Sequence, residues 1–482
     1  MGKTLVMKFG GTSVGSAAAI QRLVEITRRA QADWPRVVVV VSAMSGVTDL
    51  LLGGAHAAAA GDAAQSSGIA SELRDRHAAD LGHLVDRSGA HQALAQETEL
   101  MFAASAEEFD RLCQAVAVLG EASPRALDAI SSLGERMSAP LVAAALTAAG
   151  VPAKVVDAAR VVVTDASFQS ASPDMEATAA RAAAVVVPLL EAGCVPVVTG
   201  FIGATPAGVV TTLGRGGSDF SAAILGVALN ADEVWIWTDV DGVMTADPRL
   251  VPQARTLPEL TFREISELAF YGAKVLHPKT IRPVVERGLA LWVKNTFNPA
   301  GPATRVARDE EATHGGVKAV TVYKGQCIIT LEGRGMIGIP GIAARTFAAV
   351  ARTGTSVAMI SQASSEQSIC FVVPCGAAAA VMKALHDEFR LELARRDIDS
   401  VTTSPESAVV TVVGAGMRHT PGISGKVFGV LGQAGVNVVA IAQGSSECSI
   451  SLVVSAAEAD AAVRAVHGLI EIGMDGKRAR EE

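Results

Sequence analysis

Short apolar runs alternate with helical patterns along residues 3–303. The runs are rich in β-branched or aromatic residues and are bounded by Gly, Pro or charged residues, as strands are. Continuous apolar runs joined by helices are typical of parallel strands that are buried on both faces. We therefore expect an α/β fold with helices on both faces of a mostly parallel central sheet. The expected strands are residues 5–9, 36–44, 153–157, 195–203, 233–240 and 289–295.

Helical signals fill the connections between these runs. Ser16 is a good N-cap residue, and Ile20, Leu23 and Thr27 recur after it at helical spacing. Residues 51–150 are alanine-rich and largely helical in pattern. We expect them to form a helical insertion that packs over one end of the sheet.

A second region of the chain contains an internal repeat. The stretch from Gly338 to Val373 aligns without a gap with the stretch from His419 to Val454. Each copy has the pattern strand, turn, helix, strand, turn, strand, which predicts two small α+β modules packed side by side.

The repeat suggests the domain boundaries. Residues 304–316 (TRVARDEEATHGG) are polar, which suits a linker. We expect one domain over residues 1–303 and two modules over residues 317–400 and 401–482. The two modules can exchange strands with each other under this interpretation.

Composition excludes several classes of protein. A chain of 482 residues is long enough for two or three domains. A net charge of −8 with 4% aromatic residues argues against a nucleic-acid partner, which needs basic stripes and stacking surfaces. No apolar run reaches the length of about twenty residues that a membrane span needs, and no secretory signal is evident, so we expect a cytoplasmic protein without a membrane partner. The six cysteines form no metal-ligating pattern, so we expect reduced, mostly buried thiols and no protein-ligated metal.

The sequence KFGGTS, which begins at Lys8, covers the end of the first expected strand and the turn after it, ahead of the first expected helix. Backbone N–H groups and the helix dipole hold anions at such a helix start, and glycine lets the backbone approach closely. Lys8 adds a mobile positive charge. Taken alone, a glycine pair after a strand is more often a simple turn, and the spacing of a Walker A loop is missing.

Four further stretches could carry chemistry. TTLGRGGSDFS places Arg215 and Asp219 among glycines at a helix start, an unusual composition for a loop without a function. The others have ordinary structural explanations when each is taken singly. They are TDVDGVMTADPR (238–249) as a turn, YGAKVLHP (271–278) with Lys274 as a solvated helix charge, and SLGERMS (132–138) with a surface ion pair.

Together and in this order, these stretches and SAMSGVT (42–48) resemble the aspartate kinases of the amino acid kinase family over essentially the whole chain. The tandem repeat resembles the paired ACT modules that follow the kinase domain in that family, and its ISQASSE and IAQGSSE segments are most similar to the threonine-sensitive branch. The resemblance implies the three-layer amino acid kinase fold followed by two βαββαβ modules. It also implies ATP-dependent phosphorylation of the side-chain carboxylate of L-aspartate to 4-phospho-L-aspartate, the first step of lysine, threonine and methionine biosynthesis.

The resemblance further implies the roles of the motif residues. The catalytic residues would be Lys8, Asp219 and Lys274, with Lys8 and the amides of Gly10 and Gly11 holding the transferred phosphoryl group. Aspartate would be bound by Ser42, Thr48, Glu135, Arg215 and Ser218. The nucleotide would be bound by Thr238, Asp239, Met244, Asp247, Arg249 and Lys274. Met244 departs from the family, whose members often have tyrosine there, and Mg²⁺ is expected to arrive with ATP, held mainly by phosphates and water.

The ACT-like modules imply regulation by an amino acid. The resemblance places the effector contacts at Ile342, Gln362, Ile423 and Gln443, with threonine favoured as the effector and lysine as the alternative. A purely structural role, in which the glutamines only cap strand edges, is the competing explanation. Such modules pair across subunits, so we expect a homodimer or a homotetramer.

Three alternative functions are each disfavoured by the sequence. A kinase acting on glutamate, acetylglutamate or a nucleotide is disfavoured by the paired repeats and by the combination of GERMS with GRGGSD. A catalytically inactive amino-acid sensor is disfavoured because both lysines, Arg215 and Asp219 are retained. A fused homoserine dehydrogenase is not expected, because the residues after His467 leave no room for a dinucleotide-binding fold.

Overall fold

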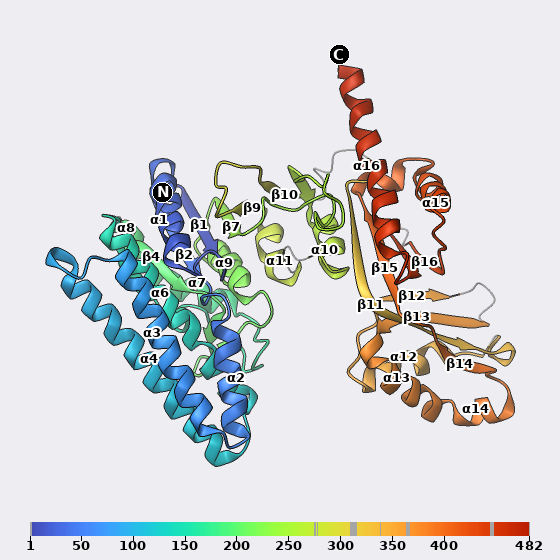
Figure 1. Cartoon of the computed structure of the whole chain (residues 1–482), viewed down its shortest axis with the longest axis horizontal. Helices are drawn as coiled ribbons and strands as arrows, with labels where there is room; N and C mark the ends of the chain where they lie inside the picture. Colours follow the sequence, from blue (N-terminus) through green and yellow to red (C-terminus); the bar gives the residue numbers. More distant parts are fainter. Residues whose placement is uncertain are drawn as a thin grey trace. The chain divides into compact units, whose positions relative to one another are not determined.

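The computed structural model describes residues 2–273, 276, 278–308, 316–337, 339–362, 367–443 and 448–481, and for residues 63–65, 418–419 and 471–481 it describes the backbone only. The chain forms two compact units (Figure 1). The first comprises Met1–Val243, Pro258–Phe262 and Leu276–Arg308, and the second comprises Met244–Leu257, Arg263–Val275 and Asp309–Glu482. In the described part of the chain, no helix is long and apolar enough to cross a membrane.

The first unit is built on an eight-stranded sheet with the strand order β3-β4-β2-β1-β7-β9-β10-β8. Its strands pair in parallel, except that β9 and β10 are antiparallel. The mostly parallel sheet expected from the sequence is therefore confirmed. The strands are β1 (Thr4–Phe9), β2 (Arg36–Val41), β3 (Ala153–Val156), β4 (Val195–Thr199), β7 (Glu233–Thr238), β8 (Glu259–Thr261), β9 (Ala290–Asn295) and β10 (Thr304–Ala307).

The alternation of side chains along β1 shows why helices cover both faces of this sheet. Leu5 and Met7 are fully buried in a core that also holds Ile20 and Leu23 of α1 (Ala17–Asp33), whereas Lys8 points to the opposite face, where α9 (Gly217–Ala228) lies. Helix α1 begins as expected, because the Ser16 hydroxyl accepts a hydrogen bond from the Ala19 N–H.

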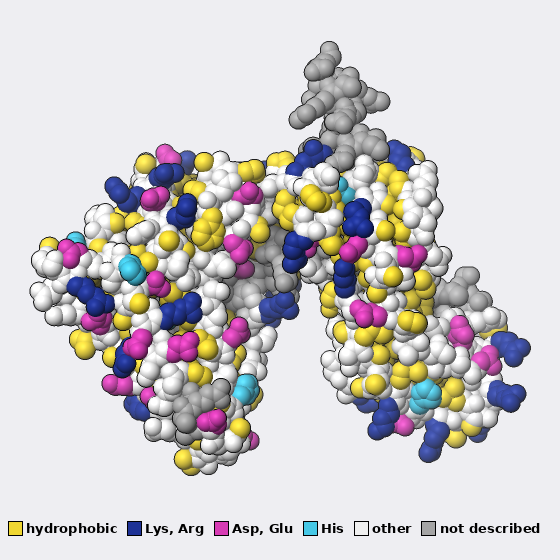
Figure 2. Space-filling view, in the orientation of Figure 1, with side chains coloured by type: hydrophobic (Ala, Val, Ile, Leu, Met, Phe, Trp, Pro, Cys, Tyr) yellow, Lys and Arg dark blue, Asp and Glu magenta, His cyan; other side chains and the backbone are white. Residues whose placement is uncertain are grey.

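The alanine-rich region forms five helices that share the core of β1 and β2, and α3 and α4 run side by side (Figure 1). Basic and acidic side chains are interspersed over the face of the first unit seen in Figure 2. The helices between β2 and β3 are α2 (Val47–Ala59), α3 (Ala63–Leu84), α4 (Gln92–Leu119), α5 (Pro124–Ser131) and α6 (Leu133–Ala148). Farther along the first unit are α7 (Met175–Val185), α8 (Val187–Glu191) and α11 (Pro278–Arg287).

Two details of the first unit differ from the sequence expectation. The expected strand 195–203 is broken after β4, because the chain turns at Phe201 with φ of 66°, and β5 (Ile202–Ala204) then pairs antiparallel with β6 (Val210–Thr212). Residues 304–307, which the polar composition assigns to a linker, form strand β10, because buried Thr304 and Val306 continue the sheet next to β9.

The second unit contains a seven-stranded antiparallel sheet in the order β12-β13-β11-β15-β17-β16, with β14 paired to β11. Helices cover it, and α10 (Phe262–Phe270) also belongs largely to this unit. The strands are β11 (Ala319–Glu332), β12 (Met359–Gln362), β13 (Ser368–Pro374), β14 (Ser400–Thr403), β15 (Ser407–Val413), β16 (Ala440–Ala442) and β17 (Ser449–Ser455). The helices are α12 (Ile342–Arg352), α13 (Cys375–Glu388), α14 (Arg390–Arg395), α15 (Ile423–Gln433) and α16 (Ala459–Glu481).

Strand β11 belongs to both repeat modules. Its first part, Ala319 to Tyr323, pairs with β15 of the second module, and its last part, Gln326 to Glu332, pairs with β13 of the first. A bulge separates the two parts, where Gly325 has φ of 74°. The first module then has the order β11-α12-β12-β13-α13-β14, and the second has β15-α15-β16-β17-α16 closed by the start of β11. Because β14 pairs with β11, the expected boundary at residues 400 and 401 falls inside a strand of the first module.

One cysteine pair corrects the expectation of free thiols. Cys327 in β11 and Cys375 at the start of α13 form a disulfide. Strand pairing brings them together, because Cys327 lies opposite Val373 in the β11–β13 register and Cys375 follows two residues later. Cys113, Cys194 and Cys370 are free thiols.

Candidate active site

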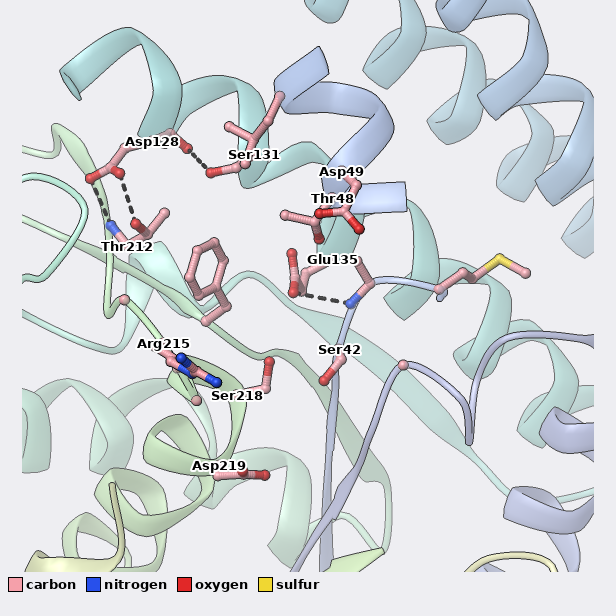
Figure 3. Close-up of a pocket in the computed structure, with 18 of the residues that line it drawn as sticks. Ser42, Thr48, Asp49, Asp128, Ser131, Glu135, Thr212, Arg215, Ser218 and Asp219 are labelled. Atoms are coloured by element: carbon pink, nitrogen blue, oxygen red, sulfur yellow. Dashed lines mark hydrogen bonds between the residues drawn. The ribbon is translucent and has the colours of Figure 1, made fainter. Parts of the chain in front are cut away.

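A cavity of about 740 Å³ opens in the first unit, where the ends of β1 and β2 face the start of α9. Figure 3 shows Arg215 and Ser218 on one side of it and Ser42, Thr48 and Glu135 on the other. The residues expected to bind aspartate therefore share one cavity with Lys8 and Asp219, two of the three expected catalytic residues. Those lining it are Lys8, Gly11, Ser42, Thr48, Glu135, Arg215, Ser218 and Asp219.

Lys8 and Asp219 form an ion pair at the base of the cavity. The Nζ atom of Lys8, one residue before the end of β1, lies 2.6 Å from Oδ1 of Asp219 in the first turn of α9. Their side chains are 11% and 15% exposed, so solvent screens the pair weakly. The carboxylate fixes the direction of the ammonium group while leaving it at the cavity wall.

The backbone N–H groups of Gly10 and Gly11, which follow β1, differ in their hydrogen bonding. The Gly10 N–H donates to the Trp237 carbonyl at 3.1 Å, so this amide is occupied by the neighbouring strand and cannot hold a phosphoryl group as expected. A Cβ atom at Gly10 would lie 3.4 Å from Lys8 Nζ, at ordinary van der Waals contact, so this glycine lies directly beside the ammonium group. For the Gly11 N–H, no hydrogen bond is found within the described ranges, and this amide stays available to a ligand.

Glu135 is the buried acid of the site. Its carboxylate Oε1 accepts the Ala43 N–H at 3.0 Å, and the Ser138 hydroxyl, one turn further along α6, donates to the Ser42 carbonyl at 2.7 Å. These bonds fasten the loop after β2 to α6. Oε2 of Glu135 is buried and has no hydrogen-bond partner among the described residues. Burial raises the pKa of Glu135 to about 8, although the Ala43 N–H and the charge of Lys8 act in the opposite direction.

Arg215 lies on a glycine loop at the entrance to α9. Gly214 and Gly216, on either side of it, have φ values of 76° and 72°, a left-handed conformation that favours glycine. The Arg215 side chain is exposed, and within the described part of the chain no ion pair or hydrogen bond of its guanidinium group is found. Its fork of donors is thus free for a carboxylate.

The sequence did not single out several residues of the cavity wall. Asp128 lies in α5 and is buried. Its carboxylate accepts hydrogen bonds from the N–H and the hydroxyl group of Thr212 (Figure 3). Nothing in the short sequence around Asp128 distinguishes it from a surface helix acid, because its partners lie far away in the chain. The other unpredicted wall residues include Asp49, Gln169, Phe201 and Thr212.

The residues expected to bind nucleotide are divided between the two compact units. Thr238 ends β7 in the first unit, and its hydroxyl group donates to Asp239 at 3.2 Å. Met244 and the ion pair of Asp247 with Arg249, at 2.6 Å, belong to the second unit. None of these described residues lines the cavity of the first unit. Lys274 lies outside the described residues.

The residues expected to bind an effector lie in equivalent places of the two modules. Ile342 begins α12 and Gln362 ends β12, and both line a second cavity of about 320 Å³ together with Met336, Pro340 and Ile369. Ile423 begins α15, and Gln443 directly follows β16. The glycine before each helix, Gly341 or Gly422, has a positive φ of 96° or 86°.

Comparisons with known proteins agree with this architecture. Residues 3–295 match the amino acid kinase family, and residues 329–389 and 410–469 each match an ACT domain. The chain is 36% identical to bifunctional aspartokinase/homoserine dehydrogenase 1 of Arabidopsis thaliana over 96% of its own length and 50% of that protein. It thus spans about half the length of this bifunctional relative.

Shorter relatives are matched over most of their length. Aspartokinase 1 of Arabidopsis thaliana is 33% identical over 97% of this chain and 80% of that protein. Two structures of E. coli aspartokinase III, one with lysine and aspartate and one with aspartate and ADP, have a TM-score of 0.75 at 31% and 30% identity. Each similarity covers 97% of this chain and 99% of that protein. The chain therefore belongs to the amino acid kinase family, among the aspartokinases whose kinase region is followed by ACT domains.

Proposed function

We propose that this chain is an aspartate kinase, which transfers the γ-phosphoryl group of ATP to the side-chain carboxylate of L-aspartate and forms 4-phospho-L-aspartate. One observation carries the proposal: a single cavity holds the Lys8–Asp219 ion pair, the guanidinium group of Arg215 and Oε2 of Glu135, which has no hydrogen-bond partner in the described part of the chain. The product would enter lysine, threonine and methionine biosynthesis. The family membership and the E. coli aspartokinase III structures with aspartate support the proposal.

The charges of the cavity suit an amino acid with a second carboxylate. Arg215 binds the α-carboxylate through two parallel N–H donors, and Glu135 pairs with the α-ammonium group. Ser218 at the start of α9 adds a hydroxyl donor. The side-chain carboxylate then lies toward Ser42 and Thr48, and Thr48 belongs to the first turn of α2, whose positive N-terminus favours an anion.

Phosphoryl transfer to a carboxylate requires fixed positive charge more than it requires an acid or a base. Negative charge spreads over the oxygens of the transferred group, and preorganised donors stabilise it without rearranging. Lys8 supplies the cation and the Gly11 N–H supplies a backbone donor, while Asp219 holds Lys8 in place. We assign Lys274 as a second cation for the nucleotide phosphates.

The nucleotide is proposed to bind through the residues that the family resemblance implies, which are Thr238, Asp239, Met244, Asp247 and Arg249. The E. coli aspartokinase III structure with ADP supports this assignment. Mg²⁺ prefers oxygen ligands, and we propose that it arrives with ATP and is held mainly by the phosphates and by water. When bound, Mg²⁺ would neutralise developing charge on the phosphates.

The ACT domains are proposed to bind an inhibitory amino acid, with threonine favoured and lysine as the alternative. Gln362 and Gln443 can each donate to and accept from the polar groups of such an effector. The E. coli structure with lysine supports an amino acid as the ligand. Assembly into a homodimer or a homotetramer is proposed to run through these domains, since Ile360 on edge strand β12 and Ile441 on edge strand β16 are 49% and 44% exposed.

An ATP-dependent assay that couples ADP formation to a visible reaction tests the proposal. The purified chain is incubated with Mg²⁺, ATP and, in separate reactions, L-aspartate, L-glutamate or N-acetylglutamate, and hydroxylamine traps the acyl phosphate. We expect turnover with L-aspartate and no turnover with the other two acceptors. Turnover with one of the other acceptors, or with none, contradicts it. The same assay with added threonine or lysine identifies the effector, and sedimentation with and without that effector reports the assembly.

A further inference from the structure

Asp128 is a buried carboxylate in the wall of the kinase cavity, and the expected substrate contacts do not include it. It lies in α5, and its side chain is almost fully buried. Both carboxylate oxygens accept the Gln169 N–H at 3.0 Å, and they also accept the Thr212 N–H at 2.9 Å and the Thr212 hydroxyl at 2.7 Å. Three donors from two distant segments therefore converge on one negative charge.

The first of these segments is held in an unfavourable conformation. Gln169 has φ of 67°, which residues other than glycine rarely adopt. Its N–H is directed at the Asp128 carboxylate, and a hydrogen bond to a charged group is stronger than one to a neutral group. Asp128 thus stabilises a backbone shape that the loop would not take alone.

The second segment leads directly to Arg215. Thr212 ends β6, and the Leu213 N–H after it donates to the Phe201 carbonyl at 2.9 Å. A Cβ atom at Gly214 would lie 2.8 Å from the Gln169 carbonyl, so the loop before Arg215 packs directly on the segment that Asp128 holds. Asp128 thereby fixes both the strand that enters the Arg215 loop and the surface on which that loop rests.

We propose that Asp128 is a positioning residue for the amino-acid substrate: by holding Gln169 and Thr212, it places the guanidinium group of Arg215 to bind the α-carboxylate. This inference rests on the proposed function. It predicts a selective loss of amino-acid binding, because Asp128 touches neither the Lys8–Asp219 pair nor the turn after β7. A purely structural role would instead lower stability without separating the two substrates.

The main variant is Asp128→Asn, which keeps the shape of the side chain but turns an amide NH₂ toward the N–H donors. We expect its KM for aspartate to rise about tenfold or more, because small displacements of a binding group are costly, while its KM for ATP stays within about twofold. Calorimetric titration of L-aspartate should show the same loss of affinity. The matched control is Asp232→Asn, since Asp232 also accepts a backbone N–H, that of Thr4 at 2.7 Å, but does not line the cavity.

A second pair of variants keeps the test decisive if Asp128→Asn does not fold. Thr212→Val removes only the hydroxyl bond to Asp128 and should raise the KM for aspartate about fivefold, as expected for one net hydrogen bond. Thr212→Ser keeps the hydroxyl group and should restore the parent value. Folding of each variant is checked by circular dichroism and thermal unfolding.

The outcomes separate this inference from the proposed function. If the parent protein turns over aspartate and the folded variants keep the parent KM, or if the KM values for aspartate and ATP rise together, Asp128 has no positioning role. If the parent protein neither binds nor phosphorylates aspartate, the proposed function fails and this inference falls with it.

Discussion

The Nζ atom of Lys8 and the Oδ1 atom of Asp219 lie 2.6 Å apart, although one residue belongs to the first strand and the other to helix α9. Each group neutralises the charge of the other in a largely buried position. The pair joins β1 to α9 across the face of the sheet on which the cavity opens, so the position of the ammonium group is set before any substrate arrives. This geometry accounts for a lysine that is nearly buried and yet available to a transferred phosphoryl group.

Lys8→Ala should reduce turnover by about three orders of magnitude while the protein remains folded, because the lost charge acts on the transferred group. Steady-state kinetics with ATP and aspartate measure the loss, and circular dichroism measures folding. Lys3→Ala is the matched control, since Lys3 is an exposed lysine just before the same strand. Parent-like turnover of the Lys8 variant would remove Lys8 from the proposed mechanism.

Aspartate should bind more tightly as the pH rises from about 6.5 to 8.5. The pKa of Glu135 is raised to about 8 in the free protein, so below that pH the group is mostly protonated and must lose its proton to pair with the ammonium group. Calorimetric titrations in buffers of different ionisation enthalpy measure both the affinity and the released proton. Glu135→Gln should bind aspartate weakly and without this pH dependence, and an unchanged pH profile in that variant would contradict the assignment.

The same shift has the opposite effect on the stability of the free protein. The pKa of Glu135 is higher in the folded state than its ordinary value of 4.5, so the protonated group contributes stability that is complete below pH 4.5 and is lost as the pH rises through about 8. The free energy of unfolding of the parent protein without ligands, measured with denaturant, should therefore decline over this pH range. The decline should be smaller for Glu135→Gln. Equal slopes for the two proteins would mean that Glu135 titrates normally.

Gln443→Ala should weaken feedback inhibition more than catalysis, because the amide is proposed to contact the effector and lies outside the kinase cavity. Inhibition curves with threonine and with lysine measure the effect, and uninhibited turnover serves as the reference. Gln362→Ala tests the equivalent position of the first module. The control is Gln433→Ala, an exposed glutamine at the end of α15 in the same module. Superimposable curves for Gln443→Ala and the parent protein would refute effector contact at this position.

Local sequence patterns predicted much of this structure. Most differences between the expected and the observed structure arise from contacts between segments that are distant in the sequence. The strand of Lys8, the helix after Ser16 and the glycine loop around Arg215 were evident because propensity, capping and turn chemistry act over a few residues. The bond from Gly10 to Trp237, the disulfide of Cys327 with Cys375 and the partners of Asp128 depend on segments that are distant in sequence. The spacing of such residues in the sequence does not predict that they are in contact, so these contacts are evident only from the three-dimensional structure.

Strand β11 ties the two ACT domains into one folding unit. Residues 319–323 close the sheet of the second domain, although they precede the first domain in the chain. A fragment that begins after β14 would leave one side of β15 without its hydrogen-bonded neighbour, so the second domain cannot be excised intact at the point where the repeats divide. A gene that encodes half of the regulatory region would thus encode an unfinished sheet.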